Sequence, residues 1–402
     1  MKTVLTAVCL ATVCGQLIAA DWLQFRGPGG TGISPEANLP VQLDAKSVTW
    51  KINLPGRGLS SPVIVGDKIF VTACSSTEQD RLHLLCFSAK DGAKLWERQF
   101  WATGRTMAHP KTSVAANTPC SDGKRLFCLF SSNDLLCLDL DGNVLWLRGL
   151  TRDYPNASNS LGMASSPVIV GDTLVCQVEN DSESFAIGLA ATTGANRWKL
   201  DRPKMANWTS PLVLSGTNAN ASALVVLQSG KGLSAIEPRT GKEVWYYTDG
   251  AATIPSSTFA GGVFYAASKG ITALRPSAGE PHPEQLWQSG QLSPATASPI
   301  VIGGKIFTLN AAGILSCADV KDGKRLWQLR LTGPFSGSPV AVGAHLYLVN
   351  EKGLVQAVNT AAPEGELASA LDLKETMLAT PSVANGAIYV RSDKTLWKLG
   401  GK

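Results

Sequence analysis

Charged and aromatic residues are scarce in this chain of 402 residues. Aspartate, glutamate, lysine and arginine together make up 17% of it and aromatic residues 7%, with a net charge of +5. The lysines and arginines are scattered and form no runs, so the basic patch typical of nucleic-acid-binding proteins is missing and we expect no nucleic-acid partner. After residue 20 no stretch is long and apolar enough to cross a bilayer, so we expect no transmembrane segment.

Motifs for metal or covalent chemistry are also lacking. No two cysteines are adjacent, and no cysteine–histidine spacing matches a zinc site. The irregular spacing of the cysteines excludes a regular disulfide framework. Cys128 and Cys137 lie on neighbouring strands of one expected hairpin, so they either form a disulfide or, like the other cysteines, replace apolar core residues. Without paired carboxylates or a nucleophile triad, we assign no catalytic residue and no metal site.

Glycine and proline are plentiful, with 39 and 22 copies, and they punctuate a repeat. Its clearest copy opens with Ser298-Pro299, turns at Gly303-Gly304 and at Asp322-Gly323, and closes with Trp327. These turn residues separate short apolar runs that predict four antiparallel strands. One such small sheet cannot bury both of its faces, so neighbouring copies must stack against each other.

The repeat recurs along the chain at the spacing of propeller blades. Its opening pair of Ser or Thr and Pro begins at Ser61, Thr118, Ser166, Ser210, Ser298, Ser338 and Thr380, and Ser257-Thr258 is a degenerate copy. The closing tryptophan is found at Trp50, Trp96, Trp146, Trp198, Trp245, Trp287 and Trp327. Leu371 takes its place in one copy. Because these tryptophans recur at one position of the repeat, we interpret them as structural residues.

The openings predict an all-β fold, an eight-bladed β-propeller of four-stranded antiparallel blades. The copy that opens at Thr380 has too few strands, whereas the strand around Trp50 has no opening pair. We therefore expect the N-terminal strand to complete the last blade and close a monomeric ring, which leaves only short edges. A seven-bladed ring is the alternative, because the copies at Ser257 and Ser338 are weak.

The N-terminus divides into two segments before the propeller. Residues 1–20 carry an early lysine, an apolar run and small residues before Asp21, which predicts a signal peptide cleaved after Ala20 and an exported, periplasmic or secreted protein. Residues 21–45 form an N-terminal extension whose Trp22 and Phe25 we expect to pack against the propeller surface. The propeller then spans residues 46–402.

Long polar loops are confined to the early copies and fall on one face of the expected ring. Loops on a rigid scaffold are where binding residues usually lie. The candidate binding-face residues are Arg105, His109, Lys111, Asp153, Asn180, Asp181, Arg202, Asn207 and Trp208. The acidic residues near Asn180 match no calcium loop, and a solvated turn is the simpler interpretation. Trp208 directly precedes a strand opening, which favours packing over ligand contact.

The closing motif resembles that of the pyrroloquinoline-quinone-type propeller repeat. The motif, Asp or Thr, then Gly, three residues and Trp, is clearest at 240–245, 322–327 and 91–96. The resemblance implies that each tryptophan docks one blade against the next. It also implies one of two kinds of protein: quinoprotein dehydrogenases that bind the quinone with calcium, or non-catalytic propellers similar to the scaffold of the outer-membrane β-barrel assembly machinery. The stretch 21–32 is similar to the start of secreted planctomycete propellers.

The dehydrogenase features of that family cannot be matched to residues of this chain. Its adjacent cysteines are missing, and no calcium ligand or catalytic aspartate can be placed. We therefore predict a non-catalytic propeller scaffold without a cofactor that binds a protein or polymer partner on its long-loop face. The alternative is an oxidoreductase dependent on pyrroloquinoline quinone and calcium with a degenerate site.

Overall fold

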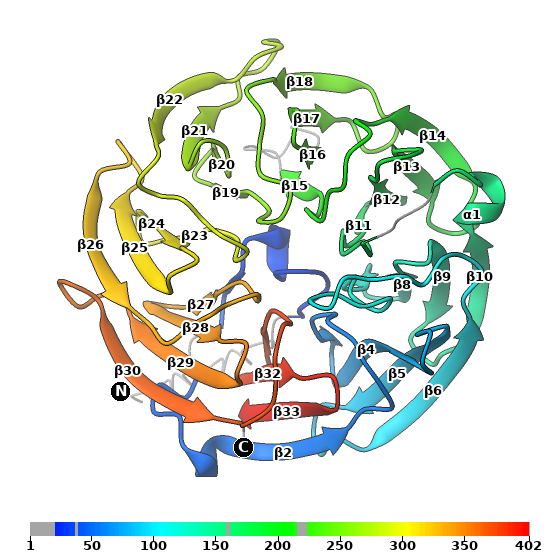
Figure 1. The fold of residues 1–402 in the computed structure, drawn as a ribbon, viewed down its shortest axis with the longest axis horizontal. Coiled ribbons are helices and arrows are strands. Elements are labelled where there is room, and N and C mark those ends of the chain that lie inside the picture. The colour runs from blue at the N-terminus through cyan, green and yellow to red at the C-terminus, as the bar shows by residue number, and fades with distance from the viewer. Residues whose placement is uncertain (1–20, 37–38, 158–160, 215–222, 402) are drawn as a thin grey trace, which may run out of the picture.

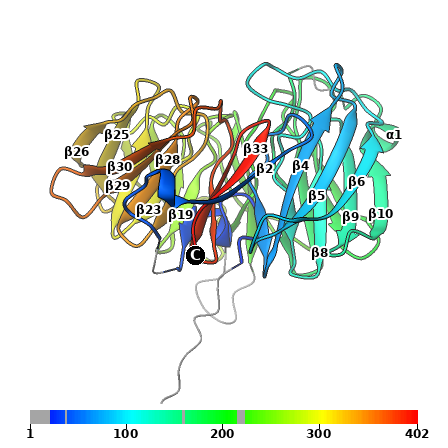
Figure 2. The same cartoon turned by 90° about the horizontal axis from the view of Figure 1, so that it is seen from below.

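The computed structural model describes residues 21–36, 39–157, 161–214 and 223–401, and within them the chain forms eight sheets arranged around one axis (Figure 1). Each sheet is a blade of four antiparallel strands, and one blade carries an added fifth strand. Figure 2 shows the ring from its side, with the strands running between its two faces. The predicted all-β, eight-bladed propeller is therefore confirmed.

The strands follow the chain order closely. Blade 1 contains β3 (Val63–Val65), β4 (Lys68–Ser75), β5 (Arg81–Ser88) and β6 (Lys94–Trp101), and blade 2 contains β7 (Cys120–Ser121), β8 (Arg125–Leu129), β9 (Asp134–Asp139) and β10 (Val144–Gly149). Blade 3 contains β11 (Val168–Val170), β12 (Thr173–Val178), β13 (Phe185–Ala190) and β14 (Asn196–Asp201), and blade 4 contains β15 (Leu212–Leu214), β16 (Leu224–Ser229), β17 (Gly232–Ile236) and β18 (Glu243–Tyr247).

The second half of the ring repeats this pattern. Blade 5 contains β19 (Thr258–Ala260), β20 (Val263–Ala266), β21 (Ile271–Arg275) and β22 (Glu284–Ser289), and blade 6 contains β23 (Ile300–Ile302), β24 (Lys305–Leu309), β25 (Ile314–Asp319) and β26 (Arg325–Arg330). Blade 7 contains β27 (Val340–Val342), β28 (His345–Val349), β29 (Leu354–Asn359) and β30 (Glu366–Asp372), with β1 (Ile33–Ser34) added, and blade 8 contains β31 (Ser382–Ala384), β32 (Ala387–Arg391), β33 (Thr395–Gly400) and β2 (Val48–Asn53).

Blade 8 closes the ring with strands from both ends of the chain. The N-terminal β2 pairs antiparallel with the C-terminal β33, from Val48 opposite Leu399 to Asn53 opposite Thr395. Figure 1 shows the blue β2 along the red β33. This closure is the predicted one, and the seven-bladed alternative is wrong.

Hydroxyl groups tie the inner ends of the blades together. At seven junctions in the described chain, the backbone N–H at a strand opening donates to the hydroxyl at the opening of the next blade, at 2.9–3.0 Å. We call the seven accepting residues the hydroxyl girdle: Thr118, Ser166, Ser210, Ser256, Ser298, Ser338 and Thr380. The recurring Ser or Thr of the repeat is therefore an inter-blade hydrogen-bond acceptor.

Two assignments within the repeat need correction by one or two residues. Blade 5 opens at Ser256-Ser257 rather than at Ser257-Thr258, because Ser256 is the residue that joins the girdle. Ser257 replaces the usual proline, and its additional N–H donates to the Gln228 side chain of blade 4. In blade 7 the position of the closing tryptophan belongs to Ser369, opposite Ala357, and not to Leu371.

The tryptophans lie against glycines of the next blade. Gly142 follows Asp141 in a turn of blade 2, and a Cβ at Gly142 would lie 2.8 Å from the ring of Trp96 of blade 1. Trp96 also donates its Nε1–H to the carbonyl of Leu140 at 3.1 Å. The same contact joins Trp50 to Gly92, Trp146 to Gly194, Trp198 to Gly241, Trp287 to Gly323 and Trp327 to Gly365. The glycine of the motif thus supplies both a positive φ and room for the neighbouring ring.

Two junctions depart from this arrangement. Trp245 is buried beside Phe264 of blade 5, with ring centroids 6.1 Å apart in an edge-on arrangement. Blade 7 has Ser369 in place of a tryptophan, and the N-terminal extension fills the gap. Ser369 donates its hydroxyl to the carbonyl of Val41 and accepts the N–H of Leu43, which is itself buried.

The extension also enters the central channel, as the blue segment at the centre of Figure 1 shows. Trp22 is fully buried and forms an antiparallel bridge with Ile64 of blade 1. Arg26 is buried too and donates to the carbonyls of Ser257 and Pro299, on blades 5 and 6. The sequence predicts that Trp22 and Phe25 pack against the propeller surface, without indicating the channel. The extension plugs the channel from the face opposite the long loops, because its main chain pairs with inner strands.

All seven described cysteines are buried, free thiols. Cys128 is opposite Leu136, whereas Cys137 is opposite Phe127, so the two side chains point to opposite faces of blade 2. A disulfide between Cys128 and Cys137 is therefore excluded by the strand register, and the interpretation of the cysteines as apolar substitutes holds.

Candidate functional site at the central pocket

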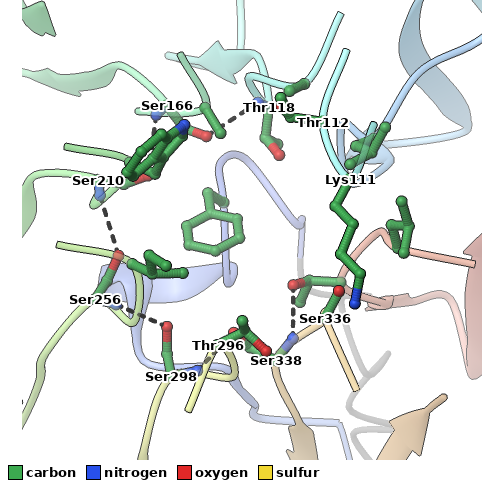
Figure 3. A pocket seen from close by; sticks show the side chains of 18 of the residues that line it. Lys111, Thr112, Thr118, Ser166, Ser210, Ser256, Thr296, Ser298, Ser336 and Ser338 are labelled. Atoms are coloured by element: carbon green, nitrogen blue, oxygen red, sulfur yellow. Dashed lines mark hydrogen bonds between the residues drawn. The ribbon is translucent and has the colours of Figure 1, made fainter. Parts of the chain in front are cut away.

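A pocket of about 350 Å³ opens on the axis of the ring, at the face that carries the connections between blades. We call this the connection face. Each of the eight connections contributes to the lining, and Phe25 of the plug forms part of the floor. Figure 3 shows the labelled hydroxyl side chains arranged around the cavity. The face that we predict to bind a partner therefore contains a cavity on the axis of the ring.

The wall of the pocket consists of two stacked rings. The lower ring is the hydroxyl girdle, all seven members of which line the cavity. The upper ring contains the residues two positions earlier in each opening, which project to the same side because side chains alternate along an extended chain. Its members are Leu59, Ala116, Ala164, Trp208, Ile254, Thr296, Ser336 and Leu378. Six consecutive members, from blade 8 through blade 5, are apolar, and the members at blades 6 and 7 are polar.

The polar side of the rim is crossed by the connection between blades 1 and 2. Lys111 reaches over to blade 7 and forms an ion pair with Glu351, with 2.9 Å between Nζ and Oε1. Ser336 donates its hydroxyl to the same carboxylate at 2.8 Å. Figure 3 shows the Lys111 side chain extending toward Ser336. This pair places one cation and one carboxylate at the rim of a wall whose other described residues are uncharged.

His109 and Trp208, two further predicted residues, also line the pocket. The N–H of His109 donates to the carbonyl of Leu161, and its Nδ1 accepts the N–H of Lys111 at 3.1 Å. Trp208 donates its Nε1–H to the carbonyl of Gly162 at 2.7 Å. Both side chains therefore brace the long connections, and Trp208 adds an aromatic wall.

Other predicted residues lie away from the pocket, around a buried carboxylate. Glu179 accepts from Arg202 Nε at 2.6 Å and from the Asn207 amide at 2.8 Å. Burial raises the pKa of the Glu179 carboxyl, although the charge and hydrogen bonds of Arg202 oppose this effect. Asn207 also donates to the carbonyl of Gln228 of blade 4. Arg202 and Asn207 thus stabilise the junction of blades 3 and 4.

The remaining candidates occupy turns and edges. Asn180 closes its turn by donating to the carbonyl of Glu183, and Asp181 accepts the N–H of Ala206. Asp153 lies in the short helix α1 (Leu150–Asp153) at the rim of blade 2 and pairs with Arg148. Arg105 is exposed on the connection between blades 1 and 2. The structure therefore brings together three of the nine predicted residues, His109, Lys111 and Trp208.

Sequence reasoning missed Phe25, Glu351 and most of the upper ring. The upper ring could have been found, because its members stand two residues before each Ser or Thr of the opening pair. Glu351 could not, since 240 residues separate it from Lys111 and only the closed ring brings them together.

A hydrogen-bonded relay that the sequence did not reveal crosses blade 1. The hydroxyl of Ser75 lies 2.7 Å from His83 Nε2, and His83 Nδ1 lies 2.8 Å from Glu97 Oε1. The three residues come from three strands, so no local motif links them. The backbone of Gly56 passes close to Ser75, since a Cβ at Gly56 would lie 3.1 Å from that of Ser75, and Ser75 is half-buried. The relay is remote from the pocket, which none of its members lines.

The lining of the pocket does not fit a calcium-bound quinone. Calcium in proteins is held mainly by carboxylate and carbonyl oxygens, and none of the described residues that line this pocket has a carboxylate. No group of three or more metal-ligating side chains occurs in the described part of the chain. Pyrroloquinoline quinone itself carries three carboxylates, whereas Lys111 is the one lysine or arginine in the described lining and is paired with Glu351.

Solved structures of similar fold include both kinds of propeller. BamB from Moraxella catarrhalis superposes with a TM-score of 0.62 at 17% identity, over 88% of this chain and 97% of that one. A europium-containing methanol dehydrogenase gives 0.71 at 12% identity, over 92% and 89%. The quinohemoprotein alcohol dehydrogenase from Comamonas testosteroni gives 0.67 at 13% identity, over 95% and 81%. At these identities the likeness concerns the fold alone.

Comparison of the sequence with family models identifies the family to which this chain belongs. No curated protein matches the chain. No helix in the described ranges is long and apolar enough to cross a membrane. The model of the family described as outer membrane protein assembly factor BamB matches residues 33–207, 183–282 and 268–368. These overlapping stretches cover most of the propeller, and the chain therefore belongs to the BamB-like family of propellers with the pyrroloquinoline-quinone-type repeat.

Proposed function

We propose that this protein is a non-catalytic, exported scaffold that binds a protein partner on its connection face. The observation that carries the proposal is a set of exposed apolar side chains beside a formed pocket. Met107, Leu161 and Ile254 are 52%, 40% and 47% exposed, and Leu161 and Ile254 also line the pocket. Exposed large apolar side chains grouped around a cavity are typical of interaction sites.

The rigidity of the surrounding structure supports this proposal. The pocket wall is fixed by the girdle, and the connections are held by the hydrogen bonds of His109 and Trp208. A preformed surface binds a partner without an ordering cost of its own. Membership of an assembly-factor family agrees with a binding role, and the predicted signal peptide, which lies outside the described residues, agrees with export.

Site-specific photocrosslinking in the producing cells tests the proposal. A photoreactive p-benzoylphenylalanine at Ile254 should give a discrete protein adduct. The matched control is the same probe at Leu326 of β26, an outer-strand residue that is 49% exposed. Adducts of equal yield at both positions, or none at Ile254, would count against a partner on the connection face, and an adduct with a polysaccharide would replace the protein by a polymer.

The oxidoreductase alternative is tested by calorimetric titration with pyrroloquinoline quinone, with and without calcium. The lining supports the expectation of no binding heat in either titration, because it lacks carboxylates for the ion. Stoichiometric binding that depends on calcium would overturn the non-catalytic proposal.

A further inference from the structure

The hydroxyl girdle has hydrogen-bond donors that nothing in the described chain uses. Each girdle oxygen accepts one backbone N–H, but none of the seven O–H groups has an acceptor among the described residues. The hydroxyl of Thr112, which also lines the pocket, is buried without any partner. A hydroxyl that accepts a hydrogen bond becomes a better donor, because hydrogen bonds in a chain polarise one another. The lower ring therefore lines the cavity with available hydrogen-bond donors.

Positive charge near the pocket also favours a negatively charged ligand that accepts hydrogen bonds. The guanidinium of Arg26, next to the floor residue Phe25, is 1% exposed, and its hydrogen bonds go to the carbonyls of Thr31, Ser257 and Pro299 rather than to a carboxylate. Its Nε has no partner at all. A buried cation without a counter-ion is costly unless a negative group lies nearby. Two of its carbonyl acceptors directly adjoin girdle residues.

A second unpaired arginine lies in the wall of the ring. Arg391 of β32 is also 1% exposed and donates to the hydroxyl of Ser60 and the carbonyl of Thr72. No ion pair is formed by Arg26 or Arg391 among the described residues. Burial lowers the pKa of Arg26 to about 9 and that of Arg391 to about 10, which leaves both charged at neutral pH. The two buried positive charges thus lie next to residues of the lining, because Arg26 adjoins Phe25 in the chain and Arg391 donates to Ser60, which adjoins Leu59.

The upper ring indicates which kind of chemical group can occupy the cavity above the girdle. Its apolar arc, from Leu378 through Trp208 to Ile254, faces a cavity of about 350 Å³. Burial of methylene groups against this arc favours a ligand with an apolar body. We propose that the pocket binds a monocarboxylate with an apolar body, its carboxylate on the hydroxyl girdle and its body against the apolar arc. The proposal rests on the proposed function, since it gives the chemistry by which the connection face holds its partner.

The carboxylate can come from two sources, a free aliphatic acid or the C-terminus of a peptide that ends in an apolar residue. Titration of the purified protein, followed by intrinsic tryptophan fluorescence and calorimetry, separates them. The probes are decanoate, decanol and decylamine, and a tripeptide ending in leucine with a free or an amidated C-terminus. We expect one site at which decanoate or the free tripeptide binds at least tenfold more tightly than its uncharged counterpart.

Variants test whether the preference for a carboxylate depends on the hydroxyl girdle. Ser298→Ala should weaken carboxylate binding about tenfold and decanol binding little, whereas Lys242→Met, an exposed lysine on a blade 4 turn, should change neither. Should Ser298→Ala fail to fold, the ligand series on the unaltered protein still decides. Equal affinity for decanol and decanoate, a preference for decylamine, or no binding of any probe would overturn the proposal. Crosslinking at Ile254 that persists without acid binding would leave the scaffold function standing.

Discussion

The contact between each tryptophan and the glycine of the next blade makes a prediction with an internal control. Gly142 and Gly123 both lie in blade 2 with φ of +83°. A Cβ at Gly142 would lie 2.8 Å from the Trp96 ring, whereas a Cβ at Gly123 would meet nothing within 4 Å. Alanine at either position therefore incurs the same left-handed backbone cost, and alanine at Gly142 also presses on the neighbouring blade.

The magnitudes follow from these two terms. The backbone term is about 1–2 kcal/mol for a residue with a Cβ, and Gly123→Ala should cost that amount. Overpacking of a well-packed contact adds about 1–3 kcal/mol, so Gly142→Ala should cost about 2–5 kcal/mol. Urea denaturation followed by tryptophan fluorescence measures both losses in the free energy of unfolding.

A double-mutant cycle isolates the contact. In a Trp96→Ala background the ring is gone, so Gly142→Ala should cost no more than Gly123→Ala does. Losses for the two glycine variants that agree within about 0.5 kcal/mol in the otherwise unaltered protein would refute the steric role of the motif glycine.

Three further predictions concern titration and reactivity. Burial alone would raise the pKa of Glu97, but hydrogen bonds from Lys94, His83 and Gln99 lower it from 4.5 to about 2. Its stabilisation is therefore complete above pH 4.5 and lost as the pH falls toward 2, so Glu97→Gln should cost about 1–2 kcal/mol at pH 7 and nearly nothing at pH 2 in denaturation experiments. Because no member of the relay lines the pocket, a fluorophosphonate probe should not label the folded protein. Labelling that Ser75→Ala abolishes would show that Ser75 is a working nucleophile. Thiol reagents should leave the folded protein unmodified and react with all the cysteines after unfolding in urea, since burial raises their thiol pKa values.

The repeat predicted most of the fold because each copy carries its own turns, opening hydroxyl and closing tryptophan. The assignments failed where a copy changes its chemistry: serine replaces proline at Ser257, and Ser369 replaces the tryptophan. The position of the N-terminal extension inside the channel could not be predicted, because a short glycine-rich stretch has no periodicity that indicates a partner strand. The pocket could not be assembled from the sequence, since Lys111 and Glu351 meet only across the ring.

The closure of blade 8 also fixes the order in which this protein can form. Strand β2 leaves the ribosome long before its partner β33 is made. Until then β2 is an unpaired edge, and the blades around it lack a closed ring. A chain that stops before Thr395 keeps that edge for good. Synthesis through β33 is thus a condition for a stable ring, so products truncated before β33 should be cleaved by proteases while chains that contain it resist cleavage.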